Sequence, residues 1–266
     1  MNLPGIGLTG NREYNVGIIK KLGPNYRLTH LGSVLISGLE ERGPKPARYR
    51  SSGHERGKLE NSISRTKNRI YELAICNPWE FFVTFTLDEK KHDRFDLPTV
   101  YSRISKFFNN YNSRYGGDVK YLIVPEPHKN GAWHFHGFVS GLPMSHLKEF
   151  SSSDHLPYKM LEYMAQGHKL YNWPAYAERF GFIYLEKIRN HEHCSGYISK
   201  YIGKAFTQSE IPLNHQLFHH SQGLKGAEVI YRGVMRRQIE QPDFENDYVR
   251  IKNFQRLEDA IPYFCD

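Results

Sequence analysis

The chain has 266 residues and a formal net charge of +8, with 24% charged and 14% aromatic residues. This length can bury a substantial core as one or two domains, and the composition excludes a disordered tail. The excess of positive charge favours a polyanionic partner. No apolar run approaches the roughly 18 residues of a membrane span, and the N-terminus lacks a signal-peptide pattern. Three widely spaced cysteines argue against a disulfide framework. We therefore expect a soluble, cytoplasmic protein with no membrane partner.

Residues 1–56 contain Gly, Pro, Lys and Arg without clear periodicity, and we interpret them as a basic N-terminal arm. Between Glu41 and Ile70 there are nine Lys or Arg residues against three glutamates. Such a stretch either contacts phosphate or forms a solvated tail. Apolar residues between 57 and 76 then predict a basic amphipathic helix that stops before Asn77-Pro78. The basic residues of this helix that we expect to contact DNA are Arg65, Lys67 and Arg69.

The next elements alternate between strands and helices. The predicted order is a strand (79–88), a helix (97–115), a hairpin (121–140), a polar insertion (141–173), a helix (174–180), a strand (182–188) and a helix (193–206). This β-α-β-β-α-β order predicts an α+β fold of split βαβ type, with an antiparallel central sheet flanked by helices. The main domain would span 57–206. Residues 207–266, with a strand at 248–251 and a helix at 257–264, would form a C-terminal extension packed on it.

The second strand of the hairpin carries two histidines, His134 and His136, two residues apart. Alternate residues of a strand leave the same face of the sheet, so both imidazoles point one way and Phe135 points into the core. Imidazoles about 6–7 Å apart on a rigid strand can share one metal ion. The alternative is a chance His-x-His pair on a solvated face.

The last predicted helix repeats a Tyr-x-x-Lys pattern, as Tyr197 with Lys200 and Tyr201 with Lys204. Residues four apart lie on one face of a helix, so the two tyrosines can face the same spot. The alternative is an amphipathic core helix with tyrosine and isoleucine inward and lysine outward.

Three motifs together resemble a known family. The strand Phe82-Val-Thr-Phe-Thr86, the His134-Phe-His136 pair and the helix Tyr197-Ile-Ser-Lys-Tyr-Ile-Gly-Lys204 are similar to the three motifs of HUH endonucleases. The match is nearest to the rolling-circle replication initiators of phages, plasmids and mobile elements. The doubled tyrosine is similar to that of the coliphage gene A initiators. The resemblance covers residues 57–225 approximately and implies a ferredoxin-like HUH nuclease domain.

The resemblance implies an enzyme that nicks one DNA strand at a replication origin. A tyrosine, Tyr197 or Tyr201, would attack the scissile phosphate and form a 5′-phosphotyrosine, which leaves a free 3′-OH to prime rolling-circle replication. Mg²⁺ or Mn²⁺ would neutralise the developing charge. Tyrosine has an ordinary pKa near 10, so Lys200 and Lys204 would stabilise the phenolate or hold the phosphate.

Glu126, on the first strand of the hairpin, is the expected third metal ligand. A two-residue turn at Asn130-Gly131 would pair Pro127 with His134 and turn Glu126 to the wrong face. A three-residue loop would instead pair Glu126 with His136 on the same face. A solvated edge carboxylate is the alternative. Initiators of the resembled superfamily often take a third ligand from this strand, which supports the placement.

Single-stranded or origin DNA is the expected partner. We expect contacts from His128 in the hairpin turn and stacking on Trp133, with Trp79 and Tyr101 as further aromatic candidates. Asp88 is expected in a turn, with metal binding as its alternative. The cluster His191-Glu-His193-Cys194 is expected to form a cap or turn. No phosphate-binding glycine-rich loop followed by Lys-Ser/Thr is present, so a host helicase and polymerase would extend the nick in a bacterial cell.

Three alternatives stay open at this stage. An HUH transposase or relaxase would use the same chemistry at the ends of a mobile element, although relaxases usually place their tyrosines near the N-terminus. A non-catalytic nucleic-acid-binding module would need neither metal nor tyrosine. A structural metal site would use the histidines without the tyrosines.

Overall fold

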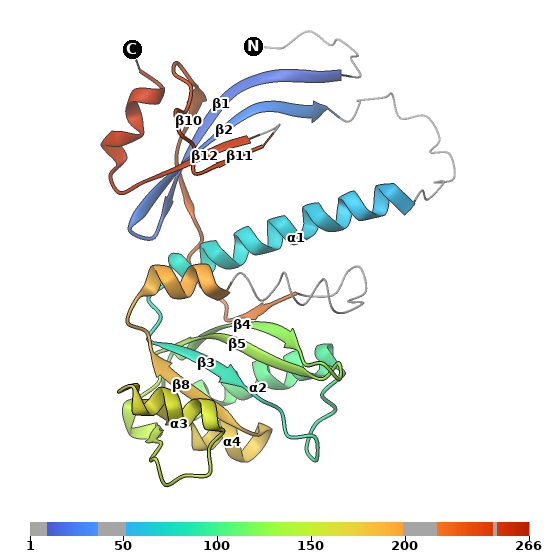
Figure 1. The fold of residues 1–266 in the computed structure, drawn as a ribbon, viewed down its shortest axis with the longest axis vertical. Helices are drawn as coiled ribbons and strands as arrows, with labels where there is room; N and C mark the ends of the chain where they lie inside the picture. Colours follow the sequence, from blue (N-terminus) through green and yellow to red (C-terminus); the bar gives the residue numbers. More distant parts are fainter. Residues whose placement is uncertain (1–9, 37–51, 199–216, 247–248, 266) are drawn as a thin grey trace. The chain divides into compact units, whose positions relative to one another are not determined.

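The computed structural model describes residues 10–36, 52–198, 217–246 and 249–265. The protein is α+β, with two antiparallel sheets flanked by helices (Figure 1). It divides into a central unit, residues 56–225, and a terminal unit made of residues 1–55 and 226–266. Among the described residues, no helix is both long and apolar enough to cross a membrane.

The sheet of the central unit has seven strands in the order β6-β7-β8-β3-β5-β4-β9. Its four middle strands follow the predicted β-α-β-β-α-β order, with α2 between β3 and β4 and α4 between β5 and β8. Every neighbouring pair among these four strands is antiparallel, so the split βαβ plan is confirmed. The bounds are β3 Phe81–Phe85, α2 Leu97–Tyr115, β4 Lys120–Pro127, β5 Trp133–Ser140, α4 Pro174–Phe180 and β8 Ile183–Lys187.

Helices α2 and α4 cover one face of this sheet. Alternate residues of β3 and β5, including Phe85 and Phe135, are fully buried there in one apolar cluster with both helices. Helix α2 begins where the Asp96 carboxylate accepts a hydrogen bond from the Thr99 N–H (3.2 Å). It ends at Gly116, whose φ of +63° is the left-handed conformation that glycine adopts at helix ends. These local signals explain why the sequence predicts the bounds of α2 correctly.

The opposite face packs against helix α1 (Ser52–Ile75) and a helix that covers 191–198 within the described residues. Phe138 of β5 stacks on Trp79, with ring centroids 5.6 Å apart. Asn77 is buried and ties α1 to the end of the unit: its amide donates to the Leu73 and Lys225 carbonyls, and its Oδ1 accepts from the Lys225 N–H. The histidines of β5 lie on this same face.

Residues 141–173 form ordered structure where the sequence predicts only a polar insertion. This stretch holds the 3-10 helix η1 (Met144–His146), strand β6 (Lys148–Glu149), helix α3 (Tyr158–Ala165) and strand β7 (Leu170–Asn172). Strand β7 pairs with β8 and thereby extends the sheet on that side. Strand β9 (His219–His220) pairs with β4 at the other edge.

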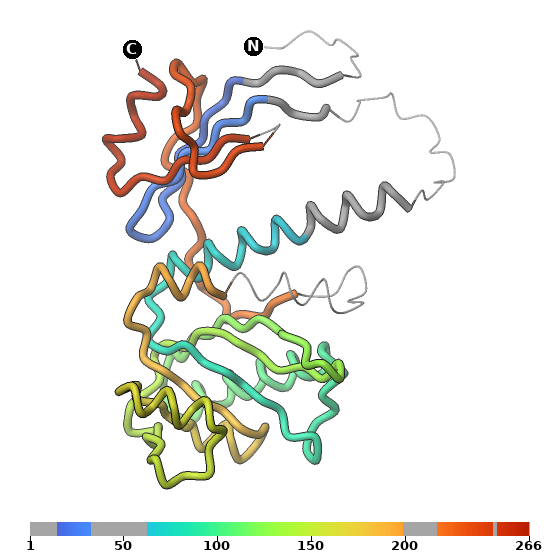
Figure 2. The backbone as a smooth tube through the Cα atoms, in the orientation of Figure 1, coloured from blue at the N-terminus to red at the C-terminus, as the bar shows by residue number. Residues whose placement is uncertain are grey.

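The terminal unit brings together the two ends of the chain. Its five-stranded sheet has the order β10-β1-β2-β12-β11, so strands from residues 10–36 lie beside strands from residues 228–254 (blue and red in Figure 2). The bounds are β1 Gly10–Leu22, β2 Asn25–Ile36, β10 Glu228–Val234, β11 Phe244–Glu245 and β12 Val249–Phe254. This grouping differs from the predicted separate arm and extension.

The missed hairpin of β1 and β2 has a sequence signal. Leu22 pairs with Asn25 across a turn at Gly23-Pro24, where Gly23 has a φ of +59°. The expected helix at 257–264 is also wrong. Two short 3-10 helices replace it, η2 (Leu257–Asp259) and η3 (Ile261–Tyr263). Pro262 has no N–H to continue an α-helix, and Ala260 between the two turns is fully buried.

Candidate metal centre

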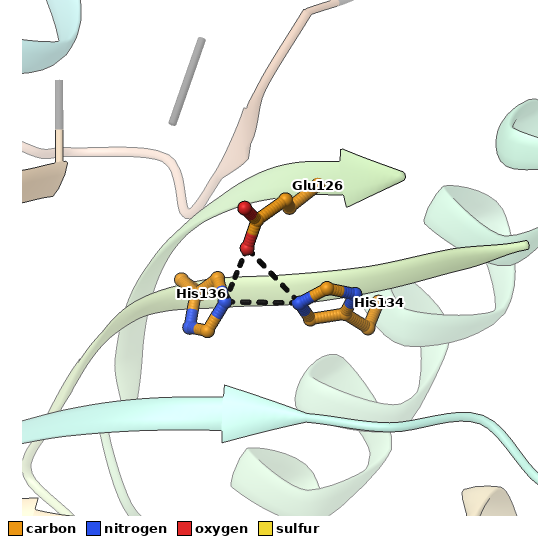
Figure 3. A group of neighbouring side chains, drawn as sticks. All are labelled: Glu126, His134 and His136. Carbon is orange, nitrogen blue, oxygen red and sulfur yellow. Dashed lines mark hydrogen bonds and ion pairs between the residues drawn. The ribbon is translucent and has the colours of Figure 1, made fainter. Parts of the chain in front are cut away.

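Glu126, His134 and His136 converge on one point (Figure 3). Glu126 Oε2 lies 3.1 Å from His134 Nε2 and 2.9 Å from His136 Nε2. The two Nε2 atoms are 3.0 Å apart. The carboxylate comes from β4 and both imidazoles from β5, so the backbone pairing of one hairpin holds all three groups. The structure therefore brings the three predicted ligands together.

The hairpin has a different register from either turn that the sequence analysis weighed. Pro127 pairs with Trp133, and Glu126 pairs with His134 across a five-residue connection, residues 128–132. Within it the His128 N–H donates to the Ala132 carbonyl (2.8 Å), and Gly131 takes a φ of +82°. Glu126 still shares a face with both histidines, because a shift by two residues restores the same face of a strand.

Burial keeps His134 neutral. Its side chain is 13% exposed, and its pKa falls from 6.5 to about 4. The main cause is loss of solvent, followed by the neighbouring His136 and His128, while the Glu126 carboxylate opposes the shift. Neutral imidazole is the form that binds a metal ion. The site therefore holds His134 in its ligand form at neutral pH.

A hydrogen bond from the neighbouring strand orients His136. Thr84 of β3 lies directly opposite His136, and its Oγ1 is 3.1 Å from His136 Nδ1. Both residues are buried. When Nδ1–H donates to the hydroxyl, the lone pair of Nε2 points at Glu126 and His134. Such an outer contact fixes the tautomer of a metal-binding histidine.

We expect Thr84→Val to weaken Mn²⁺ binding about 10- to 100-fold, because valine keeps the shape but loses the hydrogen bond to His136. Isothermal titration of the metal-free protein with Mn²⁺ measures the change. Thr86→Val is the matched control, since Thr86 follows two residues later and its printed hydrogen bond is made by the backbone. Equal affinity in both variants would show that Thr84 does not support the site.

The donor set suits a divalent cation. Two imidazole nitrogens and one carboxylate oxygen combine ligand types that Mn²⁺ and related ions accept. Adjacent ligands of an octahedral ion with bonds of about 2.1 Å lie about 3.0 Å apart, and the three donor atoms are separated by 2.9–3.1 Å. Three atoms at this spacing would occupy one face of the octahedron. The opposite face would remain for substrate and water.

Tyr197 lies near this centre, in the helix at 191–198. That helix begins at Asn190, whose Oδ1 accepts a hydrogen bond from the His193 N–H (2.9 Å). The Tyr197 ring is 43% exposed and lies 6.0 Å from the ring of Phe82. Phe82 in turn stacks on His136 at 6.2 Å. Tyr197 and His136 line the same pocket of about 500 Å³.

Lys200, Tyr201 and Lys204, the other predicted catalytic residues, lie outside the described residues. The doubled Tyr-x-x-Lys pattern is therefore described only at its first tyrosine.

The predicted DNA contacts divide into exposed and buried groups. Trp133 is only 9% exposed and belongs to the core under α2. Trp79 and Tyr101 are also buried, so the predicted stacking of these three aromatics on bases is corrected: each packs its apolar ring inside the protein. His128 is exposed, with its ring centroid 4.1 Å from that of His134.

The three basic residues of α1 differ in exposure. Arg65 and Arg69 are exposed and Lys67 is half-buried. Arg69 also lies 3.8 Å from the Glu72 carboxylate. Their predicted role in DNA binding stays a prediction.

Two competing polar groups take structural roles. Asp88 sits in a turn, where its Oδ1 accepts a hydrogen bond from the Lys90 N–H (2.9 Å). His191 begins the helix at 191–198, and its Nε2 lies 2.9 Å from the Asn77 carbonyl oxygen. Both observations agree with the turn and cap roles expected from the sequence.

Sequence reasoning missed Glu186 and His168, which lie in the same pocket as Tyr197. Glu186 sits on β8, one strand beyond β3 from the histidines. No local motif marks these residues, because β7 brings His168 to Glu186 only through sheet pairing. The alternation of β8, with Tyr184 and Glu186 facing away from the buried Ile183 and Leu185, was the available signal.

The comparisons with known proteins add one finding. Residues 80–206 match a family model of replication-associated proteins, the ORF2 type. The matched range begins just before β3 and ends after Tyr197, so it contains the Glu126, His134 and His136 cluster. It associates this part of the chain with replication. No curated protein and no solved structure matched.

Proposed function

We propose that this protein starts rolling-circle replication by nicking single-stranded DNA at an origin with a tyrosine nucleophile. The observation that carries the proposal is the proximity of Tyr197 to the Glu126, His134 and His136 cluster: Tyr197 and His136 line one pocket, and Phe82 contacts both rings. The match to the family model of replication-associated proteins supports a role in replication. The net charge of +8 supports a nucleic-acid substrate.

Each residue has a role in this proposal. Glu126, His134 and His136 would hold Mg²⁺ or Mn²⁺, which supplies positive charge at the scissile phosphate. Thr84 would orient His136. The Tyr197 oxygen would attack phosphorus as the bond to the 3′ oxygen breaks, giving a 5′-phosphotyrosine and, after protonation, a free 3′-OH. Lys200 and Lys204, one turn or less from the two tyrosines in the sequence, would stabilise the phenolate.

This link preserves the energy of the phosphodiester, so the strand can later be rejoined. The exposed position of Tyr197 agrees with attack on a bound strand, because a buried hydroxyl could not reach phosphorus. Tyr201 would serve as a second nucleophile, and a host helicase and polymerase would extend the 3′-OH.

The test uses the wild-type protein and labelled single-stranded DNA from the origin region of its own replicon. We expect a nick and a covalent protein–DNA adduct with Mn²⁺ and neither with EDTA, resolved on a denaturing gel. Mass spectrometry then locates the modified tyrosine. DNA binding without an adduct in either condition would contradict the proposal and favour a non-catalytic nucleic-acid-binding module.

A further inference from the structure

The pocket of about 500 Å³ beside His136 extends well beyond the proposed metal centre. Its walls come from β3, β5 and β8, from α3 and from the helix at 191–198. Helix α3 belongs to the insertion at 141–173 and lies beside the β8 side of the sheet in Figure 1. Phe82, Met160, Leu170 and Tyr184 give it apolar and aromatic surface. A pocket of this size and character accepts a planar ring.

A hydrogen-bonded network lies in this pocket. His168 Nδ1 is 2.7 Å from Glu186 Oε1, and the Tyr163 hydroxyl lies 3.0 Å from both oxygens of the same carboxylate. The Tyr163 ring stacks on His168, with centroids 3.6 Å apart. The network is about four-fifths buried at Glu186 and His168. Two neighbours therefore fix the orientation of the carboxylate.

The carboxylate keeps capacity for a ligand. An ionised carboxylate offers about four acceptor sites, and the His168 and Tyr163 donors use two of them. Lys159, Lys187 and Arg189 also line the pocket, so its cations outnumber its one carboxylate. This combination suits a ligand with negative charge at one end and hydrogen-bond donors at the other. A nucleotide has both, because its phosphate is anionic and its base carries donors.

We propose that this pocket binds one nucleotide of the DNA strand next to the cut and that Glu186 selects its base. The proposal rests on the proposed function, since His136 and Tyr197 form the far wall of the same pocket. Lys159, Lys187 and Arg189 receive the phosphate, and the aromatic wall stacks on the base. Glu186 accepts a hydrogen bond from an exocyclic amino group. Adenine, cytosine and guanine carry such a group and thymine does not.

The test is a binding selection that does not depend on cleavage. Wild-type protein in EDTA is mixed with a single-stranded DNA pool whose central segment is randomised, and bound strands are sequenced. We expect thymine to be depleted about tenfold at one position. Glu186→Gln should remove that depletion, because the amide NH₂ can donate to a thymine carbonyl. Lys187→Ala should weaken binding to all sequences and leave the depletion in place.

Glu149→Gln is the matched control, because Glu149 pairs with Lys169 on β6 and does not line the pocket. If Glu186→Gln does not fold, Tyr163→Phe replaces it: the ring stays, one donor to the carboxylate is lost, and the thymine depletion should fall. The proposal is overturned if wild-type protein has no depleted position, or if the depletion survives both pocket variants.

The outcome is separable from that of the proposed function. Depletion that depends on Glu186, without any covalent adduct in the nicking assay, would support the nucleotide pocket and contradict nicking. An adduct together with depletion that does not depend on Glu186 would support nicking and overturn the pocket.

Discussion

Mn²⁺ should raise the melting temperature of the wild-type protein, and His136→Ala should abolish this effect. A metal ion that binds only the folded state at 100 times its Kd stabilises that state by about 2.7 kcal/mol. For a unit of this size, that corresponds to roughly 5–10 °C. His136 supplies one of three donor atoms within 3.1 Å of each other, and alanine leaves two. Differential scanning fluorimetry with Mn²⁺ and with EDTA measures the shift.

The control for this experiment is His155→Ala, since His155 is exposed and lies outside the cluster. It should keep the full metal-dependent shift. The His136→Ala protein should also have a lower melting temperature in EDTA, because a buried ring that contacts Phe82 and Thr84 is lost. Only the difference between the two conditions tests metal binding. An unchanged difference in His136→Ala would rule out a metal ion at this site.

Tyr197→Phe should abolish the covalent protein–DNA adduct on Tyr197 and slow nicking by at least about 10³-fold if this tyrosine is the primary nucleophile. Phenylalanine keeps the ring against Phe82 but lacks the oxygen that bonds to phosphorus. Binding of single-stranded DNA should change little, which fluorescence anisotropy measures. The same denaturing gel gives the adduct and the nicking rate.

Two further tyrosine variants make the result specific. Tyr184→Phe changes another tyrosine of the same pocket and should keep the adduct. Tyr201→Phe tests the second tyrosine of the repeated pattern. An adduct that survives Tyr197→Phe and disappears in Tyr201→Phe would assign the first attack to Tyr201. An adduct that survives the double variant would exclude both tyrosines and with them the proposed mechanism.

The two experiments together separate the alternatives that the sequence left open. A metal-dependent melting shift without an adduct would indicate a structural metal site. An adduct formed equally well on DNA from the ends of a mobile element would favour a transposase. Loss of both effects would leave a nucleic-acid-binding module of split βαβ type.

The sequence alone determined the elements whose signals are local. Helix α2 has its cap at Asp96 and its stop at Gly116, and both lie within or next to the helix itself. The alternation of β5 likewise fixed that His134 and His136 share one face and that Phe135 enters the core. These predictions needed only the periods of strand and helix, which a chain carries in every short stretch.

Tertiary structure decided the features that depend on pairing between distant residues. The register of the hairpin follows from a five-residue connection, so Glu126 meets His134 where neither weighed turn would have placed it. Thr84 meets His136 because β3 pairs with β5 across 52 residues. Strand β1 pairs with β10, more than 200 residues away, which no local pattern indicates. The sequence determined which groups could bind a metal ion, and strand pairing decided which atoms meet, because backbone hydrogen bonds set the register to within one residue.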